Sequence, residues 1–274
     1  MLQASETARG LTASGEYMTS NRNLDVFSDP AVIEHYDLQK ELQESERLLF
    51  QTYLKQGMSI LDIGVGAGRT TPYLSEIAGR YIGVDYSEGM IARCRLKFPE
   101  RVFLQIDASD MSVFPDRSFD AAVFSFNGID CFSDDQTRNK CLLECARVLR
   151  PSGILILSSH NARYLFFAPV LRGISPLKKI WRLAYAIAQS CRNLPSRMVS
   201  GAFWRGEGYI RDPLSCGKSI IHATRPEHFA RELWQSGFTL TCILGAQYPL
   251  KRGVFSEPWY YYVCVKQDAG HAGS

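Results

Sequence analysis

The sequence predicts an α/β protein with a doubly wound, mostly parallel sheet of seven strands, an antiparallel last strand and a helical lid inserted after the fifth strand. Between residues 58 and 159, short runs rich in β-branched and aromatic residues alternate with helical stretches. This alternation is typical of parallel strands joined by helices that cover both faces of a sheet. A turn with three glycines follows the first run, at the edge where such sheets bind ligands.

Local start and stop signals define the expected elements. Asp29-Pro30 predicts a helix start, because aspartate caps the first amides and proline presets the first helical φ. Ser133 and Gln136 form a capping-box pattern, as do Thr224 and Glu227. We expect strands at 58–63, 81–85, 102–107, 119–125, 153–159, 239–244 and 259–266, and helices at 34–55, 70–78, 87–98 and 134–149, with a last helix between 224 and 237.

The composition is that of a soluble globular chain, since 46% of the 274 residues are hydrophobic and 22% are charged. No apolar run reaches the roughly 20 residues that a membrane-spanning helix needs. Residues 1–23 lack the basic and apolar segments of a signal peptide. The eight cysteines include no CxxC pair, which argues against a zinc site and a disulfide framework. We therefore expect a cytoplasmic protein with reduced thiols, no metal and no membrane span.

The charge is unevenly distributed along the chain. The net charge is +3, yet residues 161–211 hold nine Lys and Arg against one acid, Glu207, so this segment carries +8 and the remainder −5. A cationic segment in an otherwise acidic protein indicates an anionic partner or substrate.

The turn after the first strand indicates the class of ligand. Its sequence, Asp62-Ile63-Gly64-Val65-Gly66-Ala67-Gly68-Arg69, places three glycines at alternate positions before a helix. Glycine lets a ligand approach the backbone closely, and the helix start adds unpaired amides. A dinucleotide site would require a small residue where Arg69 stands, and the Asp62 carboxylate would repel a pyrophosphate. The same carboxylate suits a ligand with an ammonium group.

This Asp-x-Gly-x-Gly-x-Gly run resembles the first motif of class I S-adenosylmethionine-dependent methyltransferases. Other features of that family follow in order, with acids at the ends of the second and third expected strands and the run 147–153 before the fifth. Residues 124–130 (FSFNGID) and 158–161 (SSHN) are similar to a bacterial small-molecule subgroup, and the similarity extends from about 27 to 161. The resemblance implies a Rossmann-like methyltransferase fold, with S-adenosylmethionine as cofactor and S-adenosylhomocysteine as product.

The resemblance also assigns roles to individual residues. It implies that the glycine turn packs against the methionine part of the cofactor, and that Asp85 accepts hydrogen bonds from both ribose hydroxyls. It further implies that Asp107 and the Ala108 amide recognise adenine. Tyr36 is expected either to close over the cofactor or to make a core contact. The expected cofactor-binding residues are Asp62, Gly64, Gly66, Gly68, Arg69, Asp85, Tyr86, Asp107, Ala108, Ser125 and Tyr36.

Residues that face the methyl acceptor are expected just beyond the fourth and fifth strands, because ligands of open α/β sheets lie across the carboxyl ends of the strands. His160 is the first candidate for a catalytic base and Asp130 the second, since histidine exchanges protons near neutral pH. The alternative is that His160 caps a helix or contacts the cofactor loop. Substrate contacts are expected from Asn127 and Asn161, and from Trp204, Tyr209 and Arg211, whose side chains suit a carboxylate or phosphate.

The whole chain, 1–274, is expected to form one methyltransferase domain. Its parts are a mobile N-terminal arm (1–26), a helical cap (27–57), the cofactor-binding core (58–160), a basic helical insertion (161–223) and a C-terminal helix with strands (224–267). In the insertion, apolar residues between Leu177 and Cys191 keep helical spacing opposite Lys178, Lys179 and Arg182. We interpret this helix as a packed lid, with a helix on a membrane surface as the alternative. Glu41 and Glu46 are expected to be solvated.

These features predict a methyltransferase that acts on an oxygen or nitrogen atom of a small molecule, such as a secondary metabolite or a sugar. An RNA or DNA methyltransferase is the second hypothesis. The cationic insertion favours it, whereas residues 125–128 lack the Asn/Asp-Pro-Pro-aromatic motif of amino-group nucleic-acid methylases, so no nucleic-acid partner is expected. A third hypothesis is a module that binds S-adenosylmethionine without turnover. The sequence does not indicate the acceptor, the number of methyl groups transferred or the oligomeric state.

Overall fold

A seven-stranded sheet forms the centre of the protein. The computed structural model describes residues 20–165, 175–211 and 219–268. The strand order is β3-β2-β1-β4-β5-β9-β8. Strands β1 to β5 are parallel, whereas β9 lies antiparallel between β5 and β8. The strands are β1 (Ser59–Ile63), β2 (Arg80–Asp85), β3 (Val102–Gln105), β4 (Phe119–Phe124), β5 (Leu149–His160), β8 (Phe238–Gly245) and β9 (Trp259–Lys266). The predicted fold class, including the antiparallel last strand, is confirmed.

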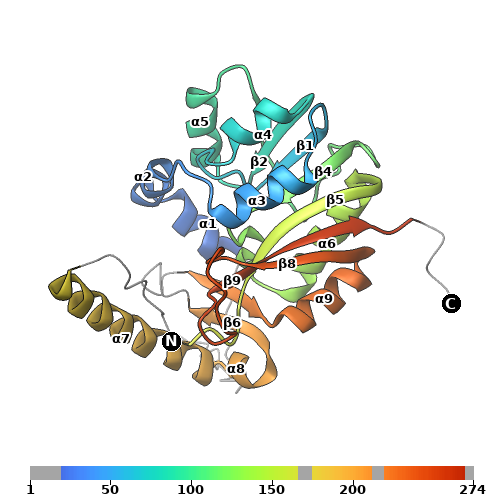
Figure 1. The fold of residues 1–274 in the computed structure, drawn as a ribbon. Helices are drawn as coiled ribbons and strands as arrows, with labels where there is room; N and C mark the ends of the chain where they lie inside the picture. Colours follow the sequence, from blue (N-terminus) through green and yellow to red (C-terminus); the bar gives the residue numbers. More distant parts are fainter. Residues whose placement is uncertain (1–19, 166–174, 212–218, 269–274) are drawn as a thin grey trace, which may run out of the picture.

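Helices cover both faces of this sheet (Figure 1). Helices α3, α4 and α5 contribute to one buried apolar cluster, and α6 and α9 contribute to the other, on the opposite face. The helices are α1 (Ser20–Ser28), α2 (Pro30–Leu38), α3 (Glu44–Tyr53), α4 (Thr71–Ile77), α5 (Glu88–Lys97), the 3₁₀ helix η1 (Gly128–Cys131), α6 (Asp135–Val148), α7 (Pro176–Val199), α8 (Ala202–Arg205) and α9 (Pro226–Gln235).

The central strand β1 shows how the core positions the glycine turn. All five of its residues are buried, as expected for a parallel strand with helices on both faces. Ile60 packs into one apolar cluster, while Leu61 and Ile63 pack into the other, because side chains alternate across a strand. The charged residue of the strand is Asp62, which stands two residues before the first glycine of the turn.

The N-terminal cap differs from the prediction in two ways. The single helix expected over 34–55 is wrong, because the chain leaves α2 after Leu38 and starts α3 at Glu44. The restart has a physical cause, since the Glu46 carboxylate accepts a hydrogen bond from the Gln43 amide at 2.8 Å and completes a capping box. In addition, residues 20–28 of the expected arm and cap form α1; residues 1–19 of the expected arm lie outside the described residues.

The three predicted helix starts have different outcomes. The Asp29-Pro30 start is confirmed, because Asp29 accepts a hydrogen bond from the Ala31 amide at 2.9 Å. The box of Ser133 and Gln136 is wrong, since the adjacent Asp134 caps α6 by accepting from the Thr137 amide. The second box is also wrong, because Thr224 is the last residue of a strand and α9 begins two residues later, at a proline.

The insertion contains a long helix, which the sequence pattern predicted, and a pair of strands, which it did not. Strands β6 (Glu207–Arg211) and β7 (Ile220–Thr224) pair antiparallel as a separate two-stranded sheet. Helix α7 matches the predicted helix, yet the packed-lid interpretation is wrong, because its apolar residues are exposed rather than packed. Among the residues that the structure describes, no helix is both long enough and apolar enough to cross a membrane.

Candidate functional site

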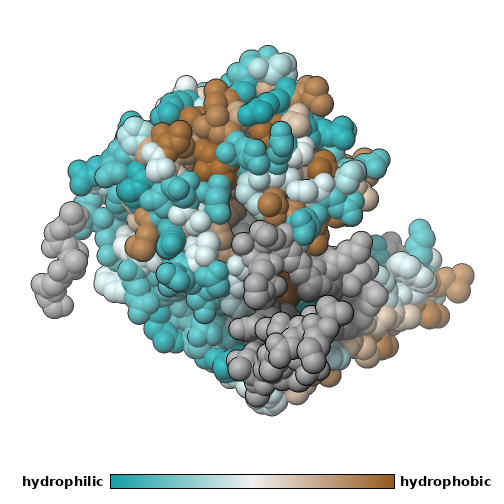
Figure 2. All heavy atoms as spheres, turned by 180° about the vertical axis from the view of Figure 1, so that it is seen from behind, coloured by the Kyte–Doolittle hydropathy of each residue, from teal (hydrophilic) through white to brown (hydrophobic). Residues whose placement is uncertain are grey.

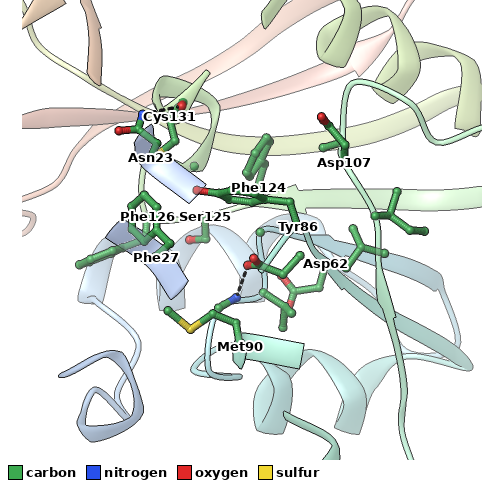
Figure 3. Close-up of a pocket in the computed structure, with 18 of the residues that line it drawn as sticks. Asn23, Phe27, Asp62, Tyr86, Met90, Asp107, Phe124, Ser125, Phe126 and Cys131 are labelled. Carbon is green, nitrogen blue, oxygen red and sulfur yellow. Dashed lines mark hydrogen bonds between the residues drawn. The ribbon is translucent and has the colours of Figure 1, made fainter. Parts of the chain in front are cut away.

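The glycine turn between β1 and α4 forms one wall of a pocket at the carboxyl edge of the sheet (Figure 3). Gly64, Gly66 and Gly68 all have positive φ, which disfavours any other residue. A Cβ added at Gly64 would lie 2.7 Å from the Phe124 ring, so this glycine serves packing. At Gly66 the nearest atom would be in the Tyr36 ring at 3.9 Å. Gly66 is therefore the position where backbone is open to a ligand.

Two buried carboxylates flank this turn. Asp62 accepts hydrogen bonds from the Thr70 hydroxyl at 2.6 Å and the Tyr81 hydroxyl at 2.8 Å. Asp85 accepts from the amides of Gly66 and Ser87, each at 2.9 Å. Burial raises the pKa of each carboxyl to about 6, which the hydrogen bonds only partly offset. Both residues line the pocket, so a ligand with hydroxyl or ammonium donors would meet carboxylates that are already oriented.

The far end of the pocket contains the residues expected to recognise an aromatic base. These are Asp107 and Ala108; Tyr86, which was expected to bind the cofactor, also lines the pocket. Asp107 accepts hydrogen bonds from the Ser109 amide and hydroxyl, both at 2.8 Å, which fixes the carboxylate. The Tyr86 hydroxyl is buried and, within the described part of the chain, has no hydrogen-bond partner. A buried hydroxyl without a partner is costly, so this pocket fits a ligand that supplies a polar group there.

Helix α1 closes one side of the pocket, a role that no sequence pattern predicted. Asn23 and Phe27 line the pocket, and the Asn23 side-chain amide donates to the carbonyls of Cys131 and Ile220, each at 2.8 Å. These contacts join residues more than 100 positions apart in the chain. Figure 3 shows Asn23 and Phe27 across the pocket from Asp107.

Tyr36 lies among aromatic side chains at the pocket. Its ring packs edge to face against Phe27, with centroids 6.0 Å apart, and against Phe126 at 6.5 Å. All three residues line the pocket. Tyr36 also lies beside the open Gly66 position, 3.9 Å from a Cβ placed there; its closing over the cofactor stays a prediction.

A buried ion pair between Arg69 and Glu46, which we call the brace, adjoins the pocket. The two terminal guanidinium nitrogens of Arg69 donate to Glu46, at 2.5 and 2.6 Å, and the Ser125 hydroxyl donates to the same carboxylate. The prediction that Glu46 is solvated is wrong, since its side chain is fully buried. Burial alone would raise the pKa of Glu46, but the Arg69 contacts lower it. Arg69 and Ser125 line the pocket, yet their polar groups are directed to this brace.

The predicted base candidates form a dyad beside the pocket. The Asp130 carboxylate lies 2.8 Å from His160 Nδ1 and accepts from the His160 amide at 2.6 Å and the Ser159 hydroxyl at 2.7 Å. Asp130 is fully buried, and these three hydrogen-bond contacts hold its carboxylate against the ring. His160 Nε2 lies 3.4 Å from the Asn127 side-chain amide. Phe126 and Gly128, the neighbours of Asn127, line the cofactor pocket.

The remaining predicted acceptor contacts lie elsewhere. Asn161 is fully buried and braces a loop, because its side chain donates to the Val254 and Glu257 carbonyls and accepts from the Arg163 amide. Tyr209 donates to Asp135 at 2.9 Å, whereas Trp204 and Arg211 are exposed. Among the described residues that line the pocket, none of these four side chains is found.

Comparison with known proteins agrees with this geometry. Residues 61–157 match the family described as "Methyltransferase domain". This stretch holds β2, β3 and β4 and most of β1 and β5, together with the glycine turn and Asp85 and Asp107. The chain carries a class I S-adenosylmethionine-dependent methyltransferase domain. The cofactor of such a domain is S-adenosylmethionine.

Relatives of this methyltransferase domain differ in what their names say they act on. A demethylmenaquinone methyltransferase of Tropheryma whipplei is 32% identical over 118 residues, which are 42% of this chain and 47% of that protein. A phosphatidylethanolamine N-methyltransferase of Cereibacter sphaeroides is 32% identical over 114 residues, or 39% of this chain and 53% of that protein. The matches thus span about half the length of these curated relatives.

The solved structures share the fold over a longer stretch. A Burkholderia thailandensis 1,6-didemethyltoxoflavin-N1-methyltransferase, solved with its substrate and S-adenosylhomocysteine, is similar with a TM-score of 0.59. The similarity covers 96% of this chain and 94% of that chain at 17% identity. The likeness therefore includes the elements outside the matched family region, at the level of fold.

Proposed function

We propose that the protein transfers the methyl group of S-adenosylmethionine to an oxygen or nitrogen atom of a small molecule, with His160 as the base. The observation that carries this proposal is the 2.8 Å contact between His160 and the buried Asp130, next to the pocket that carries the cofactor motifs. A module that only binds the cofactor has no need for an oriented histidine there.

The dyad suits proton removal from an acceptor. A carboxylate beside Nδ1 favours the tautomer with the proton on Nδ1, so that Nε2, which faces the Asn127 amide at 3.4 Å, carries the lone pair that can accept a proton from a bound acceptor. In the reaction, the bond between sulfur and methyl breaks as the acceptor oxygen or nitrogen attacks the methyl carbon, and the acceptor proton moves to Nε2. The products are the methylated acceptor, S-adenosylhomocysteine and an imidazolium that Asp130 stabilises.

The residues of the pocket fit S-adenosylmethionine. Asp85 would accept hydrogen bonds from the ribose hydroxyls, and Asp107 with the Ala108 amide would contact adenine. The open backbone at Gly66, next to Asp62, would receive the methionine part with its ammonium group. The cofactor supplies an activated methyl group, so the protein has to hold the acceptor in line with it and exclude water.

The acceptor class is inferred from the charge distribution and from the relatives. The +8 segment at 161–211 favours an anionic small molecule. The names of the relatives and of the solved structure refer to a demethylmenaquinone, a phospholipid and a toxoflavin precursor. These are small molecules with apolar parts, in keeping with the apolar lining of Phe27, Phe124 and Phe126.

The proposal is tested in two stages. S-adenosylhomocysteine should raise the melting temperature of the purified protein, while NADH should not. Production of S-adenosylhomocysteine is then followed with panels of phenols, carboxylic acids and amines, anionic compounds first. Binding of the cofactor with no turnover on any panel would favour the binding-module hypothesis.

Variants of the dyad then test the assigned roles. His160→Gln should lower kcat by roughly 10²- to 10⁴-fold, the usual contribution of a general base, and leave S-adenosylhomocysteine affinity unchanged. Asp130→Asn should lower kcat less and shift the pH profile, because Asp130 acts through the ring. His228→Gln, on α9, is the matched control and should retain activity. Full activity of His160→Gln would overturn the assignment of the base.

A further inference from the structure

Helix α7 turns its apolar side outward. Leu177, Ile180, Trp181 and Ile187 recur at helical spacing and therefore share one side of the helix. Their exposed fractions are 80%, 65%, 68% and 65%. Figure 1 shows α7 projecting from the body, and Figure 2 shows apolar side chains on this projecting part, at the right-hand edge. We name this set of four residues the apolar stripe.

The helix is anchored through its opposite side. Ala186 and Arg197 of α7 are buried, at 5% and 2% exposure. They lie eleven residues apart, which is about three turns, so they share one side of the helix, roughly opposite the apolar stripe. Arg197 donates to the Asn161 carbonyl at 3.4 Å and lies over the Tyr164 ring at 5.4 Å. A helix that packs on its own domain normally buries its apolar side, and α7 does the reverse.

The charge of α7 indicates what covers the stripe. The helix contains no acidic residue, and Lys178, Lys179 and Arg182 are exposed away from the stripe. A strongly amphipathic helix with Lys and Arg on its polar side and Leu, Ile and Trp on the other is the type that lies in the surface of an anionic membrane. A second copy of the helix would bring like charges together, which disfavours self-association.

We propose that α7 docks on an anionic phospholipid bilayer, with the apolar stripe at the boundary between headgroups and acyl chains. The 24 residues of α7 would lie along the surface for about 36 Å, and long lysine side chains would reach the headgroup phosphates. The buried end of α7 contacts Asn161, the residue after His160. Docking therefore brings the carboxyl edge of the sheet close to the membrane.

The test is flotation of the full-length protein with vesicles of phosphatidylcholine, with and without phosphatidylglycerol. The wild type should float with the phosphatidylglycerol vesicles and bind less at high salt, because screening weakens charge attraction. Leu177→Glu should weaken binding by roughly tenfold or more, since it removes an apolar side chain from the boundary and adds a negative charge. Leu96→Glu on α5 is the matched control, because Leu96 is 79% exposed, and should bind like the wild type.

Each outcome decides the proposal. Flotation of the wild type and of Leu96→Glu, with loss in Leu177→Glu, supports it. No flotation of the wild type, or equal flotation of Leu177→Glu, overturns it, as does self-association through α7 without vesicle binding. S-adenosylhomocysteine binding and the melting temperature, measured on all three proteins, show that the variants are folded and keep this test separate from the proposed methyl transfer.

Discussion

Replacing Glu46 with Gln tests whether the buried ion pair braces the pocket. The Glu46 carboxylate accepts two hydrogen bonds from Arg69, one from the Gln43 amide and one from the Ser125 hydroxyl. Glutamine keeps the shape but leaves the guanidinium of Arg69, whose side chain is only 11% exposed, without a counter-charge. Removing one partner of a buried pair costs about 3–5 kcal/mol. We expect a loss of that size in the free energy of unfolding, and a fall in melting temperature of roughly 6 to 20 °C.

The assay is chemical and thermal denaturation beside a control from the same helix. Glu44 pairs with Arg47 at 3.8 Å, and its side chain is 64% exposed, so Glu44→Gln should cost no more than about 0.5 kcal/mol. Adding Arg69→Met to Glu46→Gln should recover part of the loss, because the unpaired charge is removed. A cost below about 1 kcal/mol for Glu46→Gln, or equal costs in both Gln variants, would refute the brace.

Two further predictions concern the cofactor pocket. Because burial raises the pKa of Asp85 to about 6 and the ribose hydroxyls donate to its ionised form, S-adenosylhomocysteine affinity measured by calorimetry should fall as the pH drops below about 6. Asp62 has a pKa raised to the same value and would face the ammonium group, so Asp85→Asn and Asp62→Asn should each reduce this pH dependence; an unchanged slope in Asp85→Asn would contradict its assignment. Gly66→Ala should weaken S-adenosylhomocysteine binding, whereas Gly237→Ala, also at positive φ but away from the pocket, should cost only stability. Equal loss of binding in both variants would indicate a general effect of strain.

The parts of the site that the sequence predicted are those encoded within one strand and its turn. Asp62, Asp85 and Asp107 each stand at the end of a parallel strand or just beyond it. A parallel sheet brings these strand ends to one edge, independently of the conformation of the loops. The glycine turn is similarly local. Their positions in the pocket could therefore be read from short motifs.

The parts that were missed depend on contacts between distant segments. Asn23 lines the pocket only because Cys131 and Ile220 hold it there, and no local pattern encodes that contact. Glu46 was expected in water because charged residues usually are, whereas its partner Arg69 comes from another element. Asn161 follows the predicted base directly, yet its side-chain nitrogen donates to the loop at 254–257 and its oxygen accepts from the Arg163 amide.

Trp259 gives the protein a built-in optical reporter. The other three tryptophans, Trp181, Trp204 and Trp234, are exposed. Trp259 is partly buried, with its ring centroid 5.9 Å from that of Phe126 and 6.3 Å from that of His160. The blue-shifted part of the fluorescence therefore reports changes around His160 and around Phe126, which lines the pocket, without an added label.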